Sequence, residues 1–206
     1  RHDFYLWVND DTTLFPNCLD KLLATYEVQL ASTGRSGLVV GSTCNEKGQL
    51  SYGGQRRKAG GKALQFSLVQ PGEHPQVCDS ANGNCLFISA QAAQQLGNLE
   101  EAYVHCMGDL DYGLRASKIG IPLWVTPGFV GKCGNDHPMG GSYLDSSLSF
   151  SVRWKKALSP KELSPRAWAV FCRRHAGPMW PLYWAWPYVK IVITSITAKF
   201  TSARRI

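Results

Sequence analysis

Short apolar runs alternate with helical segments between residues 4 and 126 of this 206-residue chain. The runs are rich in residues that favour strands and are too short for buried helices; they lie at 4–8, 38–40, 85–88 and 122–126. Helix-start residues followed by glycine stops predict three helices between them, beginning near Pro16, Ser89 and Asp109 and ending at Gly34, Gly97 and Gly120. This order predicts an α/β domain with a mainly parallel sheet.

Local patterns refine this prediction. The first helix is predicted from apolar residues that share one stripe: Leu19, Leu22, Leu23, Tyr26 and Leu30. The turn-forming residues 45–48 stand between the strand at 38–40 and the segment 50–52, which predicts a hairpin. The basic, glycine-rich segment 53–61 is expected to be a flexible loop.

Charge divides the chain into two parts. Residues 1–150 hold eleven Lys/Arg against fourteen Asp/Glu, a net charge of −3, whereas residues 151–206 hold eleven against one, a net charge of +10. Five of the seven tryptophans also lie after residue 150. Because the body is acidic and no recognised nucleic-acid motif accompanies the basic tail, we expect no nucleic-acid partner.

The segment after Ser142 changes to helical sequence rich in Arg, Lys and Trp, which predicts two domains, 1–141 and 142–206. Prolines and Lys190 keep every uncharged run below the roughly 18 residues that span a bilayer. Beyond Pro187, apolar residues recur on one face of an expected amphipathic helix: Val189, Val192, Ile193, Ile196 and Phe200. We expect a peripheral membrane contact through 178–200. Packing of the tryptophans on the body or on a second subunit remains the other interpretation, and the oligomeric state is left open.

Seven cysteines occur without a C-x-x-C pair, which disfavours a zinc knot or a disulfide scaffold. Most of them lie in apolar runs, as expected of small buried side chains in a reducing compartment. We therefore expect a cytoplasmic location, peripheral at the inner face of the plasma membrane. The chain enters a strand almost at once and lacks an initial Met, so we expect it to be a piece of a longer protein.

One acidic cluster follows the first strand. Asn9, Asp10 and Asp11 stand at its carboxyl end, the edge at which open α/β sheets bind ligands. Their side-chain oxygens suit Mg²⁺ or Mn²⁺, whose remaining positions can take phosphate oxygens and water. An Asx turn or a helix cap remains the other interpretation.

A second pair of carboxylates begins the helix near residue 109. Asp109 and Asp111 are about 200° apart on a helix, so they face different ways. Asp111 has Arg115 four residues on and is expected to form a structural ion pair. Asp109 can point into a cleft and act as a general base, or it can cap the helix. The two clusters together suit a reaction in which a metal holds a diphosphate leaving group while a carboxylate activates a hydroxyl.

Three segments in order resemble the inverting family 2 glycosyltransferases of the GT-A fold. Tyr5-Leu6-Trp7-Val8-Asn9-Asp10-Asp11-Thr12 resembles the strand that ends in their metal-binding Asp-x-Asp element, with Asn in first place. Asn82-Gly83-Asn84-Cys85-Leu86-Phe87-Ile88 resembles the strand that borders the acceptor. Gly108-Asp109-Leu110-Asp111-Tyr112-Gly113-Leu114-Arg115 resembles the Glu-Asp-x-Asp-x-x-x-Arg helix start, with Gly108 replacing the glutamate. The resemblance covers roughly residues 4–140 and extends to the branch that builds bacterial surface polysaccharides, including rhamnosyl- and galactofuranosyltransferase-like proteins.

The resemblance implies a GT-A, Rossmann-like fold without its first strands and helices, followed by a helical C-terminal extension. It implies transfer of a sugar from a nucleotide-diphosphate donor to a hydroxyl of a saccharide or lipid-linked acceptor, with inversion, in the synthesis of cell-surface polysaccharide or glycolipid. Asn9, Asp10 and Asp11 would bind the donor through Mg²⁺ or Mn²⁺, and Asp109 would be the catalytic base. His137, shortly before a Gly-Gly-Ser, would be a further metal ligand or a loop histidine without that role. The alternative is a degenerate GT-A domain that serves as a membrane-surface or protein-interaction module.

Overall fold

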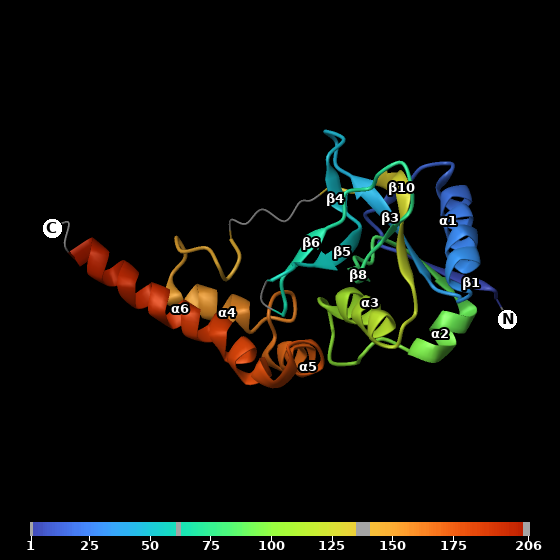
Figure 1. Cartoon of the computed structure of the whole chain (residues 1–206). Helices are drawn as coiled ribbons and strands as arrows, with labels where there is room; N and C mark the ends of the chain where they lie inside the picture. The colour runs from blue at the N-terminus through green and yellow to red at the C-terminus, as the bar shows by residue number, and fades with distance from the viewer. Residues whose placement is uncertain (1, 61–62, 135–140, 204–206) are drawn as a thin grey trace. The chain divides into compact units, whose positions relative to one another are not determined.

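A computed structural model of the chain describes residues 2–60, 63–134 and 141–203 (Figure 1). The chain divides into two compact units. The sheet unit consists of the described residues of 1–99 and 109–136, and the helical unit consists of those of 100–108 and 137–206. The domain boundary expected between 141 and 142 stays a prediction.

The sheet unit contains two sheets. The larger one has seven strands, in the order β1-β9-β3-β10-β2 with β4 beside β3 and β7 beside β10. Its strands are β1 (Phe4–Val8), β2 (Thr13–Leu14), β3 (Leu38–Cys44), β4 (Leu50–Tyr52), β7 (Gln76–Val77), β9 (Cys85–Ser89) and β10 (Leu123–Lys132). The smaller one has the order β6-β5-β8, formed by β5 (Gly54–Arg57), β6 (Phe66–Leu68) and β8 (Ser80–Ala81). The helices of the unit are α1 (Cys18–Thr33), α2 (Ala90–Leu96) and α3 (Gly108–Lys118).

The large sheet is mixed, so the expectation of a mainly parallel sheet is wrong. Among the described strands only β3 and β10 pair in parallel, and the other pairings are antiparallel. The reason is that β9 inserts between β1 and β3 and runs against both of them. β1, β3 and β10 nevertheless run in the same direction, so their carboxyl ends share one edge of the sheet.

Alternation along β3 separates two hydrophobic cores. Leu38 and Val40 face one core, together with residues of α2 and α3, while Val39 faces the other, together with residues of α1. Successive strand residues point to opposite faces, so helices cover both sides of the sheet. Figure 1 shows α1 and α3 on either side of β3 and β10.

The predicted helix ends are confirmed, but of the predicted stripe of the first helix only Leu22 and Tyr26 pack in the core. Gly34 ends α1 with a left-handed φ of 65°, and the Ser89 hydroxyl caps α2 by accepting the Ala92 N–H at 3.2 Å. The buried positions of α1 are Cys18, Leu22, Thr25 and Gln29, whereas Leu19, Leu23 and Leu30 are exposed. The Gln29 amide reaches the core side because it donates to the Leu38 carbonyl at 3.0 Å.

The segment 53–61 was expected to be a flexible loop, and for its first half this is wrong. Gln55 and Arg57 lie in β5, which pairs with β6 and β8. The Arg57 N–H donates to the Asp79 carboxylate at 2.7 Å, and the Arg57 guanidinium lies 5.2 Å from the centre of the Phe66 ring. These contacts hold the basic segment in the small sheet.

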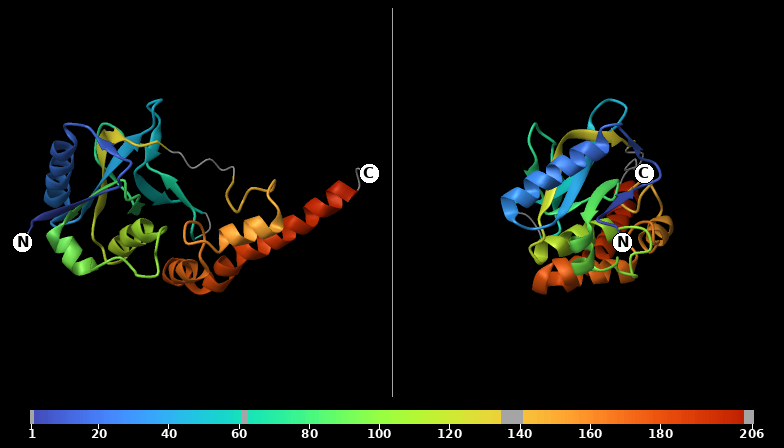
Figure 2. Two further views of the ribbon diagram at one scale, coloured as in Figure 1. Left: turned by 180° about the vertical axis from the view of Figure 1, so that it is seen from behind. Right: turned by 90° about the vertical axis from the view of Figure 1, so that its right-hand side faces the viewer.

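The helical unit contains α4 (Phe150–Ala157), α5 (Pro165–His175), a 3₁₀ turn at Gly177–Met179 and α6 (Trp180–Ala203). Figure 2 shows α4 alongside the long α6. Arg153 of α4 is buried and donates to the Tyr143 carbonyl at 2.9 Å and to the Thr194 hydroxyl at 3.0 Å. The helix expected beyond Pro187 begins earlier, at Trp180, and α6 continues through this proline. Within the described residues, no helix combines the length and apolar character needed to cross a bilayer.

The burial of the cysteines agrees with the expectation that most of them are small buried side chains. Six of the seven cysteines are buried free thiols, and Cys106 is half-buried. Cys18 of α1 and Cys85 of β9 lie in one core with their sulfurs 4.0 Å apart. The thiols therefore serve as small apolar side chains in the packing of the sheet unit.

Candidate functional site

The first acidic cluster forms an exposed turn after β1. The Thr12 N–H donates to the Asn9 carbonyl at 3.1 Å and closes this turn. Asn9, Asp10 and Asp11 are all exposed, in contrast to the half-buried Val8 at the end of the strand. Their side chains are therefore available to a ligand at the edge where β1, β3 and β10 end.

Asn84 ties this turn to the rest of the edge. Because β9 runs against β1, its first residue, Cys85, pairs with Val8, and Asn84 lies just beyond. The buried Asn84 amide donates to the Thr12 hydroxyl and to the Cys133 sulfur, both at 3.3 Å. Cys133 directly follows β10, so one side chain joins three strand ends.

Cys133 is a buried thiol that contacts Asn84 beside the acidic turn. Burial raises the pKa of the Cys133 thiol, and the carboxylate of Asp11 acts in the same direction, while hydrogen bonding with Thr12 and Asn84 acts against them. Mg²⁺ and Mn²⁺ prefer oxygen ligands to thiols. We therefore do not count Cys133 among the candidate ligands of such a cation.

In the second acidic cluster, the Asp109 carboxylate contacts the segment just before β9. One oxygen of this carboxylate, Oδ2, accepts the Gly83 N–H at 2.9 Å, and the other, Oδ1, accepts the Leu110 N–H at 2.8 Å. Gly83 is the immediate neighbour of Asn84. Asp109 and the turn after β1, about a hundred residues apart in the sequence, thus contact two adjacent residues of the sheet unit, Gly83 and Asn84.

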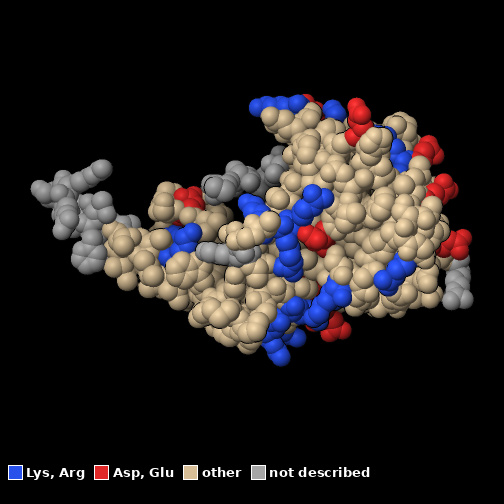
Figure 3. All heavy atoms as spheres, in the orientation of Figure 1, with Lys and Arg blue, Asp and Glu red and all other residues tan. Residues whose placement is uncertain are grey.

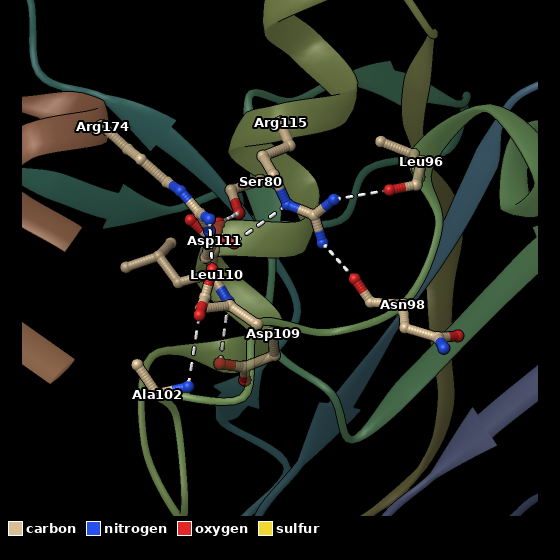
Figure 4. A network of polar contacts seen from close by, with 10 residues as sticks. Ser80, Leu96, Asn98, Ala102, Asp109, Leu110, Asp111, Arg115 and Arg174 are labelled. Carbon is tan, nitrogen blue, oxygen red and sulfur yellow. Dashed lines mark hydrogen bonds and ion pairs between the residues drawn. The ribbon is translucent and has the colours of Figure 1, made fainter. Parts of the chain in front are cut away.

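Asp111 has the structural role that its spacing predicts, and the expected ion pair is confirmed. Its fully buried carboxylate binds the Arg115 guanidinium at 2.9 Å. Arg115 also donates to the carbonyls of Leu96 and Asn98, at 2.6 and 3.0 Å. Figure 4 shows Asp111 pointing toward Arg115 and Asp109 pointing away from that pair.

Close packing fixes the position of α3 against β8. The Ser80 hydroxyl donates to the Leu110 carbonyl at 2.8 Å (Figure 4). Gly113 lies so near that a Cβ there would be 2.4 Å from the Ser80 hydroxyl and 2.8 Å from the Ser80 Cα. A side chain at position 113 would push α3 away, so the glycine permits the approach that places Asp109 beside Gly83.

The oxygen donors after β1 fit a hard divalent cation. Mg²⁺ is commonly held by one or two carboxylates together with substrate phosphates and water, and Asp10 and Asp11 supply two carboxylates, with the Asn9 amide next to them. In the described part of the chain, no three His, Cys, Asp or Glu residues gather as a metal site. His137, predicted as a further ligand, lies outside the described residues.

The sequence did not single out the side chains of Asn84 and Cys133, or the N–H of Gly83. The Asn-Gly-Asn sequence before a buried strand is a usable signal for Asn84 and Gly83, because such residues often turn the chain at a sheet edge. Cys133 offers no signal of this kind, since its contact with Asn84 joins residues 49 positions apart.

No protein-family profile matches the chain, and no curated protein matches its sequence. The chemistry of this edge is therefore considered from its own residues, among which Asp11 and Asp109 supply carboxylates.

Proposed function

We propose that this chain is the metal and acceptor side of an inverting glycosyltransferase of family 2, with a GT-A domain. The observation that carries the proposal is that Asp109 contacts Gly83 while the Asp10–Asp11 turn is tied, through Thr12, to the adjacent Asn84. A sugar transferase needs a cation beside the diphosphate and a base beside the acceptor, and this edge has carboxylates for both. The resemblance of the same segments to this family supports the proposal.

Asp109 is the proposed catalytic base. A carboxylate has about four lone-pair positions. The N–H groups of Gly83 and Leu110 each take one and hold the carboxylate in place. The remaining positions can accept the proton of an acceptor hydroxyl as its oxygen bonds to the anomeric carbon. The bond from that carbon to the diphosphate oxygen breaks on the opposite face, which inverts the configuration.

Asp10 and Asp11, with Asn9, are the proposed holders of Mg²⁺ or Mn²⁺. When bound, the cation would supply positive charge that stabilises the departing diphosphate. These residues lie in an exposed turn, so a donor can approach them from solvent. The Asn84 amide fixes Thr12 and thereby the end of the turn.

We also propose the biological setting that the resemblance implies. The donor is a nucleotide-diphosphate sugar, and the acceptor is a saccharide or lipid-linked hydroxyl used in cell-surface polysaccharide or glycolipid synthesis. The reaction takes place on the cytoplasmic side of the membrane. We assign selection of the donor's sugar and nucleotide to parts of the donor site other than this edge.

Replacing the base tests the reaction. In the full-length protein, with a panel of nucleotide-diphosphate sugars and Mg²⁺ or Mn²⁺, Asp109→Asn should lower turnover by about 10²–10⁴-fold. It should keep metal-dependent donor binding, measured by calorimetry, because the cation ligands are unchanged. Glu27→Gln, which neutralises an exposed carboxylate of α1, is the matched control and should keep wild-type turnover. Wild-type turnover in Asp109→Asn would show that this carboxylate is not the base.

A degenerate domain that acts as a membrane-surface or interaction module is the second candidate. Asn9 and Gly108 stand where the resembling family has acidic residues, and this departure favours the second candidate. The same panel decides between the two. Absence of both transfer and hydrolysis with every donor, in a folded full-length protein, would favour the module over the enzyme.

A further inference from the structure

The long helix α6 has two different apolar faces. Its inner face packs into the core of the helical unit, where Tyr188 and Ile191 are buried against Ala157 and Leu163. The Tyr188 hydroxyl donates to the Leu163 carbonyl at 2.7 Å, and the partly buried Trp184 indole donates to the Pro165 carbonyl at 3.1 Å. This face therefore already has its partner within the unit.

The opposite face of α6 is a continuous exposed stripe. We define the α6 stripe as Leu182, Trp186, Val189, Ile193 and Ile196. At about 100° per residue these five side chains fall within an arc of about 80°, roughly opposite Tyr188 and Ile191. Between 44% and 61% of each is exposed, over a length of about 20 Å. Scattered apolar residues are normal on a surface, but an ordered row of this length indicates a binding surface.

Positive charge accompanies the stripe. After residue 150 the chain has eleven Lys/Arg and one acidic residue, Glu162, whose carboxylate accepts the Tyr143 N–H at 2.9 Å. Exposed cations of the unit include Lys190 on α6, Lys155 on α4 and Arg166 on α5. In the view of Figure 3, the described part of α6 that is visible is covered mostly by uncharged atoms. The unit thus combines an exposed apolar row on α6 with exposed cations, of which Lys190 lies beside the row on the same helix.

Charge distinguishes the two occupants that an apolar row could have. A second copy of the chain would bring another +10 segment to the interface, and like charges oppose this association. An anionic lipid surface is complementary to the same charge. Trp186 also has the amphipathic ring that favours the membrane–water interface. Charge and side-chain chemistry therefore favour lipid.

We propose that the α6 stripe docks the helical unit on an anionic lipid surface, with the helix axis along the membrane plane. The buried inner face requires this orientation, because only one side of α6 is available to lipid. Apolar side chains of the stripe enter the boundary between headgroups and acyl chains, and the cations meet lipid phosphates. The inference does not depend on the proposed transfer reaction.

Vesicle co-sedimentation of the full chain tests the proposal. The probes are vesicles of phosphatidylcholine alone and vesicles with equal parts of phosphatidylcholine and phosphatidylserine. Val189→Ser combined with Ile193→Ser removes two exposed apolar groups of the stripe, and Ser has a helix propensity similar to theirs. Leu23→Ser combined with Val28→Ser changes two exposed apolar residues of α1 and is the matched control.

We expect wild type and the control to bind the anionic vesicles, and the stripe variant to bind at least about tenfold more weakly. Binding should be weaker to phosphatidylcholine alone and should fall with added salt. Equal binding by the stripe variant and wild type would overturn the proposal, as would equal binding to both vesicles. A wild-type dimer that binds neither vesicle and becomes monomeric in the stripe variant would also overturn it, in favour of a second copy.

Tryptophan emission provides a measurement that does not need the serine variants. Transfer of Trp186 from water to the lipid boundary should shift the emission of the protein to shorter wavelength when anionic vesicles are added. Trp186→Phe should retain vesicle binding and lose most of this shift. A shift of wild-type size in Trp186→Phe would show that the stripe does not enter the lipid.

Discussion

Gly83 both donates a hydrogen bond to Asp109 and packs closely against Trp7. Its N–H donates to Asp109 at 2.9 Å, and a Cβ at this position would lie 3.0 Å from two ring carbons of Trp7. Trp7 cannot retreat easily, because it packs against the core and its ring meets Tyr112 edge-on, with the ring centres 6.4 Å apart. A side chain at position 83 would therefore require Trp7 to shift by a few tenths of an ångström.

We expect Gly83→Ala to move this N–H away from Asp109. The substitution should lower the free energy of unfolding by about 1–3 kcal/mol, as overpacking does. It should also lower transferase turnover by about tenfold or more, since small displacements of a catalytic group have large effects on rate. Urea titration and initial rates measure the two effects. Gly72→Ala is the control, because its Cβ would meet only the flexible end of Gln76, at 3.2 Å. Equal rates in both variants would argue against a positioning role for Gly83.

At the element scale, Arg115 joins α3 to the end of α2. Its guanidinium binds the buried Asp111 carboxylate and the carbonyls of Leu96 and Asn98. Arg115→Met keeps an unbranched apolar stem and removes all of these bonds. We expect a loss of about 3 kcal/mol in the free energy of unfolding, because removing one partner of a buried ion pair is costly. Lys118→Met, on the exposed last turn of the same helix, is the control and should change the free energy of unfolding by less than about 0.5 kcal/mol in urea titrations. A loss as small as that of the control would show that Arg115 does not anchor α3.

Elements whose determinants are local could be predicted from the sequence. Gly34 needs only its own left-handed φ to end α1, and Asp111 needs only Arg115 one turn away. The buried face of α1 could not be predicted, because Gln29 is drawn inward by the carbonyls of Leu38 and Pro122. The second of these partners is 93 residues distant, and no pattern within one helix indicates it.

In the sheet and the candidate site, too, local features could be predicted from the sequence, whereas contacts between distant segments could not. The strand at Cys85–Ser89 could be predicted from its composition, but its insertion between β1 and β3 depends on pairings between distant segments. The sequence placed Asp11 and Asp109 at element ends, where local signals act. It did not place Asn84 beside Thr12 and Cys133, because those contacts exist only once three strand ends meet.

At the scale of the whole molecule, several buried groups are neutral and resist ionisation in alkali. Burial raises the pKa of the Tyr188 phenol to about 12, and the nearby Cys172 and Tyr143 act in the same direction. Burial also raises the pKa of the Cys172 thiol and of the Cys78 thiol to about 12. Cys78 belongs to the sheet unit and the other two to the helical unit, so both units are affected.

The sign of the effect follows from comparing the folded and unfolded chains. An unfolded tyrosine ionises near pH 10 and a cysteine near 8.5, while the folded groups stay neutral to higher pH. Their contribution to stability is therefore complete below about pH 8.5 and is lost as the pH rises toward 12. For Tyr188 alone, a difference of about two units corresponds to about 2–3 kcal/mol.

We expect the free energy of unfolding, measured by urea titration, to be nearly constant from pH 7 to 8 and to fall steadily from about pH 9 to 11. Tyr188→Phe should lower stability by about 1 kcal/mol at neutral pH, since it removes the hydrogen bond to the Leu163 carbonyl. It should also make the alkaline fall shallower, because one neutral buried acid is gone. Tyr5→Phe, at an exposed tyrosine, should reproduce the wild-type curve. An alkaline slope in Tyr188→Phe as steep as that of Tyr5→Phe would show that burial of this phenol does not link stability to pH.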